Sequence, residues 1–436
     1  MMSPKPAKIL IVDQSLRDMA GHHYEYDVAL FRAAAAAGVP VVIGAHAGVQ
    51  RLESLGNNVR PWFQRAWYES HAAGAVALPV APNPLLGWLP AIIRTPLSRV
   101  ARRIVGPRKL APAQATTGSG FGADVLALIR AERLGAGDHV LVHTFSIPEL
   151  DDLIDLARSQ RGLPLIHIIF RRDASEPTVA DGPRGGIRGS LSRLAASASA
   201  VRTLRLYADT DDLARQYAAL SPGLDVGVIP IPHCLPPPEG PQPPRAPGPL
   251  RIVYLGDARD EKGFHLLADL VDALAGKFFP QGRARFILQG NISVAGDNPV
   301  LSHARRRLAA YPGEQVALIT EQLDLAAFHD LVRSADIVLL PYDATAYARR
   351  SSGILVQALA AGRVVVVPAQ TWLARQAEAG GSVAFGTEKS LSDAVAAAVE
   401  RWPELAGAAR RNAAAFRAEH DAARYIAQLL TAGGGS

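Results

Sequence analysis

Short apolar runs alternate with longer segments of helical periodicity along most of this chain. Runs such as Lys8–Asp13, Leu163–Phe170 and Val364–Val367 are rich in β-branched residues, as expected for parallel strands that are covered on both faces. The segments between them, such as His22–Ala37 and Leu325–Ser334, have the apolar spacing of helices. Strands that alternate with helices indicate an α/β fold built on a doubly wound parallel sheet.

This rhythm runs twice through the sequence. In the first half it predicts strands at 8–13, 39–44, 75–80, 139–143, 163–170, 201–208 and 225–230, and helices at 22–37, 124–134, 148–159 and 211–220. In the second half it predicts strands at 250–255, 284–289, 315–319, 337–340 and 364–367, and helices at 264–275, 299–310, 325–334 and 354–361. The segment 173–189 holds four glycines and two prolines and is predicted to be a mobile loop.

A proline-rich segment separates the two halves. Residues 235–249 read LPPPEGPQPPRAPGP, which is the composition of a semi-rigid spacer. A chain of 436 residues is also too long for one ordinary core. We therefore expect a domain at 1–234, the linker at 235–249, a second domain at 250–405, and C-terminal helices and a tail at 406–436. Those helices can cross back to the first domain, and a ligand would lie in the cleft between the domains.

The composition narrows the class of protein. Hydrophobic residues make up 49% and charged residues 20%, which is typical of a globular chain. No apolar run reaches the ~18 residues that span a bilayer, and the chain begins with a strand and not a signal peptide. A single cysteine, Cys234, excludes an internal disulfide framework and a cysteine-rich metal site. A cytoplasmic location fits these features.

The formal net charge of +6 comes from one segment. Between Ser70 and Ala123 there are six basic residues and no Asp or Glu. The basic residues alternate with apolar ones over 84–109, so this stretch suits an anionic membrane surface on the inner face of the membrane. The alternative is a core helix with a solvated basic face. Nucleic acid is not expected as a partner, because no recognition motif accompanies the charge.

Two loops of the second half suggest phosphate binding. In the first, Arg349 and Arg350 precede Ser351-Ser352-Gly353, which opens a helix. The first N–H groups of a helix have no intrahelical partner and carry the positive end of its dipole, so they attract anions. The alternative is an ordinary capped helix after a surface loop.

The second loop lies in the sequence YLGDARDEKGFHLL, which begins at Tyr254. Gly256 ends a strand there, and Arg259 and Lys262 precede the next helix. Both cations can neutralise a diphosphate. Taken alone, this loop is also compatible with a turn whose charges are solvated. The two loops end strands of one sheet and face the same edge, which favours a shared site.

These motifs, with the two α/β domains and the sequence ALAAGRVVVV, resemble GT-B-fold glycosyltransferases, and most of all the large retaining family 4. The resemblance implies two Rossmann-like domains that face each other across a cleft. In that family, an Arg and a Lys bind the diphosphate of a nucleotide sugar. Lys262 matches the Lys, Asp257 occupies the position of the Arg, and Arg259 is a shifted substitute.

The family's paired glutamates match Arg349 and Gln357, neither of which is a carboxylate. Gln357 can still hydrogen-bond a ribose hydroxyl, while Arg349 changes the usual contact to the sugar. The opening Ser351-Ser352-Gly353 is intact and argues for a retained phosphate site. By this resemblance the donor-binding residues are Gly21, Gly256, Lys262, Arg349, Arg350, Ser351, Ser352, Gly353, Ile354 and Gln357.

The first half should supply the acceptor pocket. The family's glycine-containing loop after the first strand matches Gly21, which precedes His22 and His23. A metal site at this histidine pair is rejected, because no cysteine or suitably spaced third ligand accompanies it. Trp62 and Trp67 belong to an aromatic cluster that can stack on a sugar, dip into a membrane or simply pack.

Candidate catalytic residues come from the ends of two further strands. His143 ends the fourth expected strand and faces the same cleft edge. The family's histidine after the fifth strand is absent, and Arg171, Arg172 or Asp173 stands in its place. The resulting assignments are Lys262, Arg259, His143 and Asp173 as catalytic, and His22, His23, Trp62, Trp67, Arg171 and Arg172 as acceptor-binding.

The resemblance implies sugar transfer with retention, without a bound metal or cofactor, from a UDP- or GDP-linked sugar. The acceptor would be a saccharide or a lipid-linked saccharide of bacterial-type polysaccharide or glycoconjugate synthesis. One alternative is a non-catalytic sugar-nucleotide-binding or scaffold protein, which Arg349 and Gln357 favour. A sugar-nucleotide epimerase of the same fold is a further alternative, although the second-domain motif lacks a carboxylate pair for acid–base chemistry. A phosphorylase would need a cofactor lysine that we do not find.

Overall fold

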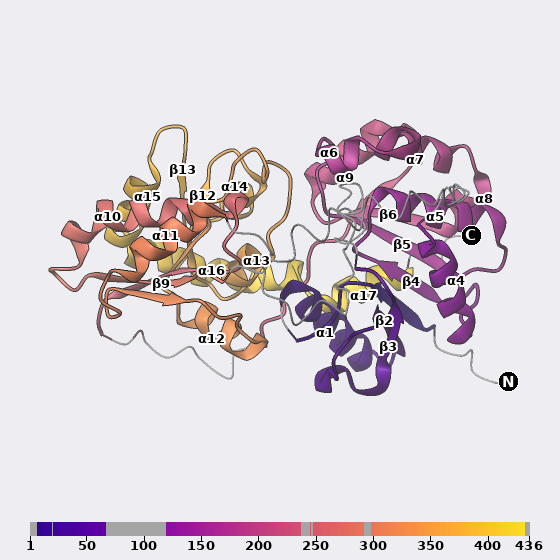
Figure 1. Cartoon of the computed structure of the whole chain (residues 1–436), viewed down its shortest axis with the longest axis horizontal. Coiled ribbons are helices and arrows are strands. Elements are labelled where there is room, and N and C mark those ends of the chain that lie inside the picture. The colour runs from indigo at the N-terminus through magenta and orange to yellow at the C-terminus, as the bar shows by residue number, and fades with distance from the viewer. Residues whose placement is uncertain are drawn as a thin grey trace, which may run out of the picture.

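The chain folds into two α/β lobes (Figure 1). The computed structural model describes residues 7–19, 21–66, 119–236, 245, 247–291 and 298–431. Each lobe contains one fully parallel sheet flanked by helices, so the expectation of two doubly wound domains is confirmed. None of the helices in the described part of the chain is long and apolar enough to cross a membrane.

The first lobe contains a seven-stranded sheet in the order β3-β2-β1-β4-β5-β6-β7. The order reverses between β1 and β4, which pair in parallel from Ile9 opposite His139. Open α/β sheets bind ligands at such a switch point, at the carboxyl ends of the strands. The strands are β1 (Ile9–Asp13), β2 (Val41–His46), β3 (Val59–Phe63), β4 (His139–Val142), β5 (Leu165–Phe170), β6 (Leu204–Ala208) and β7 (Val226–Val228). The helices are α1 (Gly21–Ala36), α4 (Phe121–Ala131), α5 (Ile147–Ser159), α6 (Pro177–Ala180), α7 (Gly186–Ala195), α8 (Ala198–Thr203) and α9 (Asp211–Leu220).

The second lobe contains a six-stranded sheet in the order β10-β9-β8-β11-β12-β13. Its central strands β11 and β12 are fully buried, as their runs of β-branched residues predict. The strands are β8 (Leu250–Tyr254), β9 (Ala284–Gln289), β10 (Val316–Ile319), β11 (Ile337–Leu339), β12 (Val364–Pro368) and β13 (Ser382–Phe385). The helices are α10 (Leu267–Phe278), α11 (Pro299–Ala309), α12 (Leu325–Ser334), α13 (Gly353–Ala360), α14 (Trp372–Gln376), α15 (Leu391–Glu400), α16 (Trp402–Glu419) and α17 (Ala422–Thr431).

The last helix returns to the first lobe, as the sequence suggested. In Figure 1, α16 and α17 run in yellow from the second lobe to the first. The Tyr26 hydroxyl on α1 donates to the Tyr425 hydroxyl on α17 at 2.9 Å. Gln428 Nε2 on α17 also donates to the carbonyl oxygen of Val228 at 2.8 Å. The C-terminus therefore ties the two lobes together at the back of the cleft.

Several predictions of secondary structure need correction. Residues 201–203, predicted as the start of a strand, belong to α8, and β13 and α14 were not predicted. The strand Val59–Phe63 was not expected; it is an edge strand that contains Arg60 and Pro61 and is mostly not buried, so it lacks an apolar run. The segment predicted as a mobile loop instead forms α6, a short 3₁₀ turn (Pro183–Gly185) and the start of α7. The strand expected at 75–80 and the basic stretch 84–109 lie outside the described residues.

Candidate functional site

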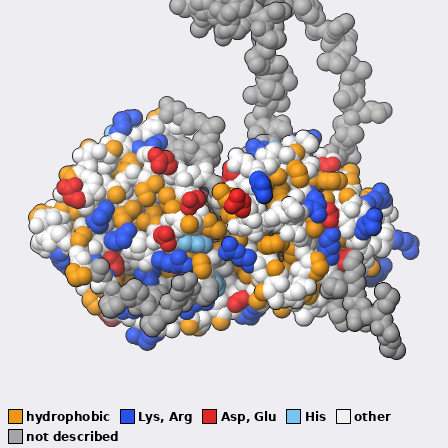
Figure 2. All heavy atoms as spheres, turned by 90° about the horizontal axis from the view of Figure 1, so that it is seen from below, with side chains coloured by type: hydrophobic (Ala, Val, Ile, Leu, Met, Phe, Trp, Pro, Cys, Tyr) orange, Lys and Arg blue, Asp and Glu red, His pale blue; other side chains and the backbone are white. Residues whose placement is uncertain are grey.

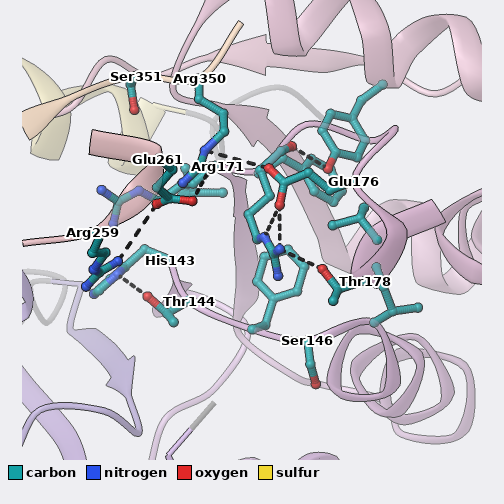
Figure 3. A pocket seen from close by; sticks show the side chains of 17 residues that line it. His143, Thr144, Ser146, Arg171, Glu176, Thr178, Arg259, Glu261, Arg350 and Ser351 are labelled. Carbon is teal, nitrogen blue, oxygen red and sulfur yellow. Dashed lines mark hydrogen bonds and ion pairs between the residues drawn. The ribbon is translucent and has the colours of Figure 1, made fainter. Parts of the chain in front are cut away.

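Two adjoining cavities of about 350 and 240 Å³ lie between the lobes. Figure 2 shows acidic and basic side chains along this boundary. The larger cavity lies against the loops that follow β4 and β5, and Figure 3 shows it from close by. The smaller cavity extends from Gly21 on α1 to Lys262 and the start of α13. The two cavities share a wall made of Arg171, Arg259, Glu261, Arg350 and Ser351.

Lys262 lies at the floor of the smaller cavity because of two glycines. Gly256 has a φ of +98°, and a Cβ built there would lie 2.9 Å from Lys262 Nζ and 2.8 Å from Ile354 Cδ1. Gly263 has a φ of +69°, and a Cβ there would clash with the carbonyl oxygen of Pro341 at 1.9 Å. Burial, and then the nearby Arg259 guanidinium, lower the pKa of Lys262 to about 8. The ammonium group is thus held in a site that an anion would stabilise.

Replacing Gly256 with alanine is expected to displace Lys262 without unfolding the protein. The new methyl group meets the end of a flexible lysine and a branched Ile354 side chain, and the positive φ adds strain of about 1–2 kcal/mol. Nucleotide diphosphate affinity should fall about tenfold or more, while the melting temperature falls by only a few degrees. Calorimetric titration and thermal unfolding of the same preparation measure both. Gly276→Ala is the matched control, because a Cβ there meets nothing within 4 Å and it lies within α10. Unchanged affinity in Gly256→Ala would show that the position of Lys262 does not matter.

Arg259, predicted to assist Lys262, is paired inside its own loop. Its Nη2 donates to Asp257 Oδ2 at 2.8 Å, and Asn291 Nδ2 donates to the other oxygen of Asp257 at 2.8 Å. Asp257 is the residue that replaces the arginine of the resembled motif. The carboxylate therefore compensates part of the positive charge beside Lys262, and Arg259 still lines both cavities.

The serine loop before α13 connects the two lobes. Ser352 is the N-cap of α13, and its hydroxyl accepts from the Leu355 N–H at 3.3 Å. Ser351 donates its hydroxyl to Asp209, which follows β6 in the first lobe, at 2.6 Å. Thr210 Oγ1 donates to the carbonyl oxygen of Arg349 at 2.8 Å. The smaller cavity is lined by Ser351, Ser352, Gly353 and Ile354, as expected of a phosphate-binding loop.

The two arginines of this loop also reach the first lobe. Arg349 Nη1 donates to Asp173 Oδ2 at 2.9 Å. Arg350 lies within 3.6 Å of Glu176 and 3.8 Å of Glu261, with its guanidinium 4.9 Å above the Tyr347 ring. Arg349 lines neither cavity, whereas Arg350 lines both. Arg349, which matches the first glutamate of the resembled family, thus makes a contact between the lobes.

Gln357, at the position of the second glutamate, is buried on α13. Its Oε1 accepts from the backbone N–H of Cys234 at 3.1 Å, where the chain passes between the lobes. It also lines the smaller cavity. The residue therefore holds the crossover segment in place while lying at the edge of the predicted donor site.

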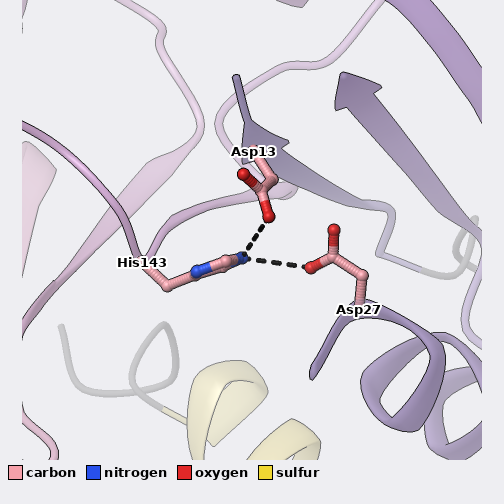
Figure 4. A group of neighbouring side chains, drawn as sticks. All are labelled: Asp13, Asp27 and His143. Carbon is pink, nitrogen blue, oxygen red and sulfur yellow. Dashed lines mark hydrogen bonds and ion pairs between the residues drawn. The ribbon is translucent and has the colours of Figure 1, made fainter. Parts of the chain in front are cut away.

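A buried cluster of carboxylates and histidines occupies the switch point of the first sheet (Figure 4). His143, directly after β4, has its Nε2 3.0 Å from Asp27 Oδ1 and 3.7 Å from Asp13 Oδ2. His23 Nδ1 lies 2.8 Å from the same oxygen of Asp13. Asp13, Asp27 and His143 are almost completely buried. Their ligand atoms all lie within 4.8 Å of one another, close enough to share a metal ion, and this grouping was not predicted from the sequence.

The cluster divides into one ionised and one protonated carboxyl group. Burial acts to raise the pKa of Asp13, but the ion pair and hydrogen bond with His23 lower it to about 2. Burial, with the neighbouring Asp13 carboxylate, holds the pKa of Asp27 well above its usual range. Burial lowers the pKa of His143 to about 4. Near pH 7, Asp13 is therefore ionised and His143 neutral, while the surroundings of Asp27 favour its protonated form. The predicted catalytic role of His143 stays a prediction; it lines the larger cavity from below.

The loop after β5 forms the wall of the larger cavity. Arg171 donates from Nε to Asp209 at 3.3 Å and lies 5.2 Å over the Tyr26 ring. Arg172 is held by Glu176, and its Nη2 donates to Thr178 at 2.6 Å. Burial acts to raise the pKa of Asp173, but hydrogen bonds from Ser175, Gln216 and Arg349 lower it to about 2. Asp173 is thus an ionised structural anchor and lines neither cavity.

The remaining predicted residues differ in their placement. Trp62 donates from its indole N–H to the carbonyl oxygen of Asp124 at 3.0 Å and packs on the core of the first lobe. Gly21 opens α1 with a φ of +77° and lines the smaller cavity. The side chain of His22 and the whole of Trp67 lie outside the described residues.

Several site residues were missed from the sequence. Asp209, Glu176, Glu261, Asp13 and Asp27 hold the predicted cations and histidines. Asp13 and Asp209 directly end or follow strands, and that position was the one signal that could have pointed to them.

A scan against protein-family models found no match, and a search of curated proteins by sequence found none. Solved structures do share the fold. An α,α-trehalose-phosphate synthase (UDP-forming) from Burkholderia vietnamiensis is 14% identical, with a TM-score of 0.60 and coverage of 98% of this chain and 100% of that one. A glycosyltransferase involved in avilamycin A biosynthesis is 15% identical, with a TM-score of 0.53 and coverage of 99% of both chains.

A putative UDP-N-acetylglucosamine 2-epimerase from Listeria monocytogenes is equally similar in architecture. It is 12% identical, with a TM-score of 0.53 and coverage of 98% of this chain and 96% of that one. These likenesses confirm the expected GT-B architecture over the whole chain. At such identities they carry the fold alone, because one fold hosts several chemistries.

Proposed function

We propose that this protein is a retaining glycosyltransferase that moves a sugar from a nucleoside-diphosphate sugar to a saccharide acceptor. The single observation that carries the proposal is the placement of Lys262. Its ammonium lies beside Gly256 just after β8, next to the start of α13, and Lys262 lines the smaller cavity. A cation and a helix N-terminus that converge on one cavity suit the charge of a leaving diphosphate.

In this mechanism, the donor diphosphate occupies the smaller cavity. The acceptor hydroxyl attacks the anomeric carbon from the larger cavity as the bond from that carbon to the phosphate oxygen breaks. The departing phosphate oxygen takes the hydroxyl proton on the same face of the sugar, so no protein base is needed and the configuration is retained. Lys262, Arg259 and the first N–H groups of α13 stabilise the charge that develops on the diphosphate. The diphosphate needs no metal ion, because these groups supply the positive charge.

The contacts between the lobes support a closed reaction site. Arg349 with Asp173 and Ser351 with Asp209 hold the loop before α13 against the first lobe. Closure of this kind excludes water and limits wasteful hydrolysis of the donor. These bonds give Arg349 a structural role, which differs from the sugar contact of the glutamate at the matching position of the resembled family.

We take UDP as the first donor nucleotide to test, since the synthase with the highest TM-score among the neighbours described is UDP-forming. GDP remains the alternative. A lipid-linked acceptor on the inner face of the membrane belongs to the proposal as well, through the basic stretch 84–109. Membership of family 4 is part of the proposal, because the Lys262 loop and the Ser351–Gly353 loop are its basis.

A thermal-shift panel with UDP, GDP, ADP, TDP and CMP tests the donor site. A ligand that binds only the folded state adds about RT ln(1 + [L]/Kd) to the free energy of unfolding and so raises the melting temperature. A response to one diphosphate therefore names the donor class. The sugar nucleotides of that base then serve as donors in assays of transfer and hydrolysis. Binding without turnover would support the scaffold alternative, and a changed sugar without acceptor would support the epimerase. No response to any nucleotide would overturn the proposal.

A further inference from the structure

The larger cavity carries a surplus of positive charge. Four arginines line it, Arg171, Arg172, Arg259 and Arg350, against two carboxylates, Glu176 and Glu261. In the smaller cavity, Lys262 and three of these arginines face four carboxylates, so its formal charges balance. Among its lining residues the larger cavity therefore has two more cations than carboxylates. Three of its arginines, Arg171, Arg259 and Arg350, belong to the wall that both cavities share. Asp209 and Asp257, which do not line the larger cavity, pair with Arg171 and Arg259.

Arg350 has hydrogen-bonding capacity to spare. Its guanidinium makes no hydrogen bond with any residue in the described ranges, only ion pairs at 3.6 Å with Glu176 and 3.8 Å with Glu261. It is 22% exposed and is steered by the Tyr347 ring at 4.9 Å. A guanidinium held at this distance from two carboxylates is oriented by them, and its N–H groups can still donate hydrogen bonds to a ligand.

Arg171 faces the same space from the first lobe. Its Nε donates to Asp209, while neither Nη makes a hydrogen bond with the part of the chain that the structure describes. The Tyr26 ring supports its guanidinium at 5.2 Å. Figure 3 shows Arg171 and Arg350 close together on one side of the cavity, one from each lobe. By contrast, Arg172 is held by Glu176 and Thr178 and lines the larger cavity alone.

We propose that the larger cavity binds an anionic acceptor, a saccharide that carries a phosphate or a carboxylate group, and that Arg171 and Arg350 are the ligands of that group. The inference rests on the proposed function and names its acceptor class. Planar guanidinium groups suit both anions, because they present paired donors. A neutral sugar would offer only weaker, uncharged acceptors to the N–H groups of Arg171 and Arg350 that make no hydrogen bond within the described residues. Because Arg171 and Arg350 come from different lobes, the anion also favours the closed arrangement.

The test is a binding panel on the full chain in saturating UDP, with inorganic phosphate, three hexoses, their 6-phosphates and their uronic acids. We expect at least one phosphate or uronate to bind tenfold or more tightly than its neutral parent, as measured by calorimetry. The phosphate and uronate arms separate the two sources of the anion. In Arg171→Gln and Arg350→Gln this preference should fall at least tenfold. Arg215→Gln, an exposed arginine on α9 that lines neither cavity, is the control and should keep it.

Each outcome bears on the inference. Equal affinity for neutral and anionic sugars, no sugar binding at all, or a preference that survives in both variants would overturn it. Binding of UDP in the same wild-type preparation reports separately on the proposed function. If UDP binds and the anion preference is absent, the acceptor class is wrong while the donor site stands. If the anion preference is present and no nucleotide binds, the proposed transfer is wrong while the anion site stands.

Discussion

Replacing Lys262 with alanine is expected to reduce sugar transfer by about 10²–10³-fold, which is the usual cost of removing one donor to a developing negative charge. Lys262 Nζ lies against Gly256, just after β8, where a Cβ would come within 2.9 Å of it. The fold should survive, because shortening this side chain leaves no buried partner without its hydrogen bond. The measurement is the initial rate of transfer with the donor that the nucleotide panel identifies, together with thermal unfolding.

Lys277 provides the matched control for this substitution. It is an exposed lysine on α10 that pairs with Glu400 and lies outside both cavities. Lys277→Ala should transfer sugar at the wild-type rate. If Lys262→Ala also retains the wild-type rate, Lys262 does not stabilise the leaving group and the proposed reaction centre is wrong.

The pH dependence of nucleotide affinity gives an independent signature of Lys262. Its pKa is lowered to about 8 in the free protein, and a bound diphosphate favours the charged form and raises that pKa. Binding near pH 8 should therefore take up a proton, and affinity should fall as the pH rises above 8. In Lys262→Arg the guanidinium stays charged throughout this range, so the decline should disappear.

Much of the fold follows from the sequence because its signals are local. The strand at Ala284–Gln289 and the helices at Leu325–Ser334 and Asp211–Leu220 match the predicted bounds. The central strands β11 and β12 of the second lobe were easier to predict, because they are buried on both faces and read as continuous apolar runs. The edge strand β13 of the same lobe, which is only partly buried, was missed. The edge strand Val59–Phe63 has one partner and a polar face, and therefore has no such run.

The segment 173–189 shows how composition can mislead. Its glycines indicated a loop, but two of them allow close packing of short helical turns. A Cβ on Gly186 would meet the carbonyl oxygen of Ala180 at 2.0 Å, and one on Gly189 would meet that of Arg184 at 1.9 Å. Such contacts depend on the folded backbone. Residue types alone cannot distinguish a glycine needed for flexibility from one needed for space.

For each contact in the candidate site, the sequence predicted only one of the two residues. Lys262, Ser351 and Arg350 were predicted because a cation or a serine in a loop that follows a strand suits phosphate binding. Their partners could not be found, because Asp209 is 142 residues from Ser351 and Asp173 is 176 residues from Arg349. The pairing of the two lobes sets these contacts, and it leaves no local pattern in the sequence.

The largest expected effect on stability concerns two aspartates of one cluster. Asp13→Asn should destabilise the protein by about 1–3 kcal/mol at pH 7, because the buried Asp13 carboxylate accepts from the Ser15 N–H and lies 2.8 Å from His23 Nδ1, and an amide cannot replace both contacts. Asp27→Asn should not destabilise the protein at the same pH, because an amide has the shape and neutrality of the protonated acid. Both side chains are fully buried, so the two substitutions form a matched pair.

The pH dependence follows from the direction of each pKa shift. Asp13 has a lowered pKa, so its stabilising effect is present above about pH 4 and is lost as the pH falls towards 2. Asp27 has a raised pKa, so the wild-type protein loses stability as the pH rises above about 4, where the unfolded chain releases this proton. Asp27→Asn has no proton to release, and its stability relative to wild type should therefore increase with pH.

Urea unfolding of the wild type and both variants at several pH values between 5 and 8 measures these differences. Circular dichroism of the folded variants establishes that each keeps its secondary structure. Equal destabilisation by the two substitutions would mean that Asp27 is ionised as well and that the proton does not reside on it. A larger effect of Asp27→Asn would reverse the assignment, with Asp13 as the protonated member. His143 would then lie against an ionised partner, and its role at the floor of the larger cavity would change from a neutral ring to a positively charged one.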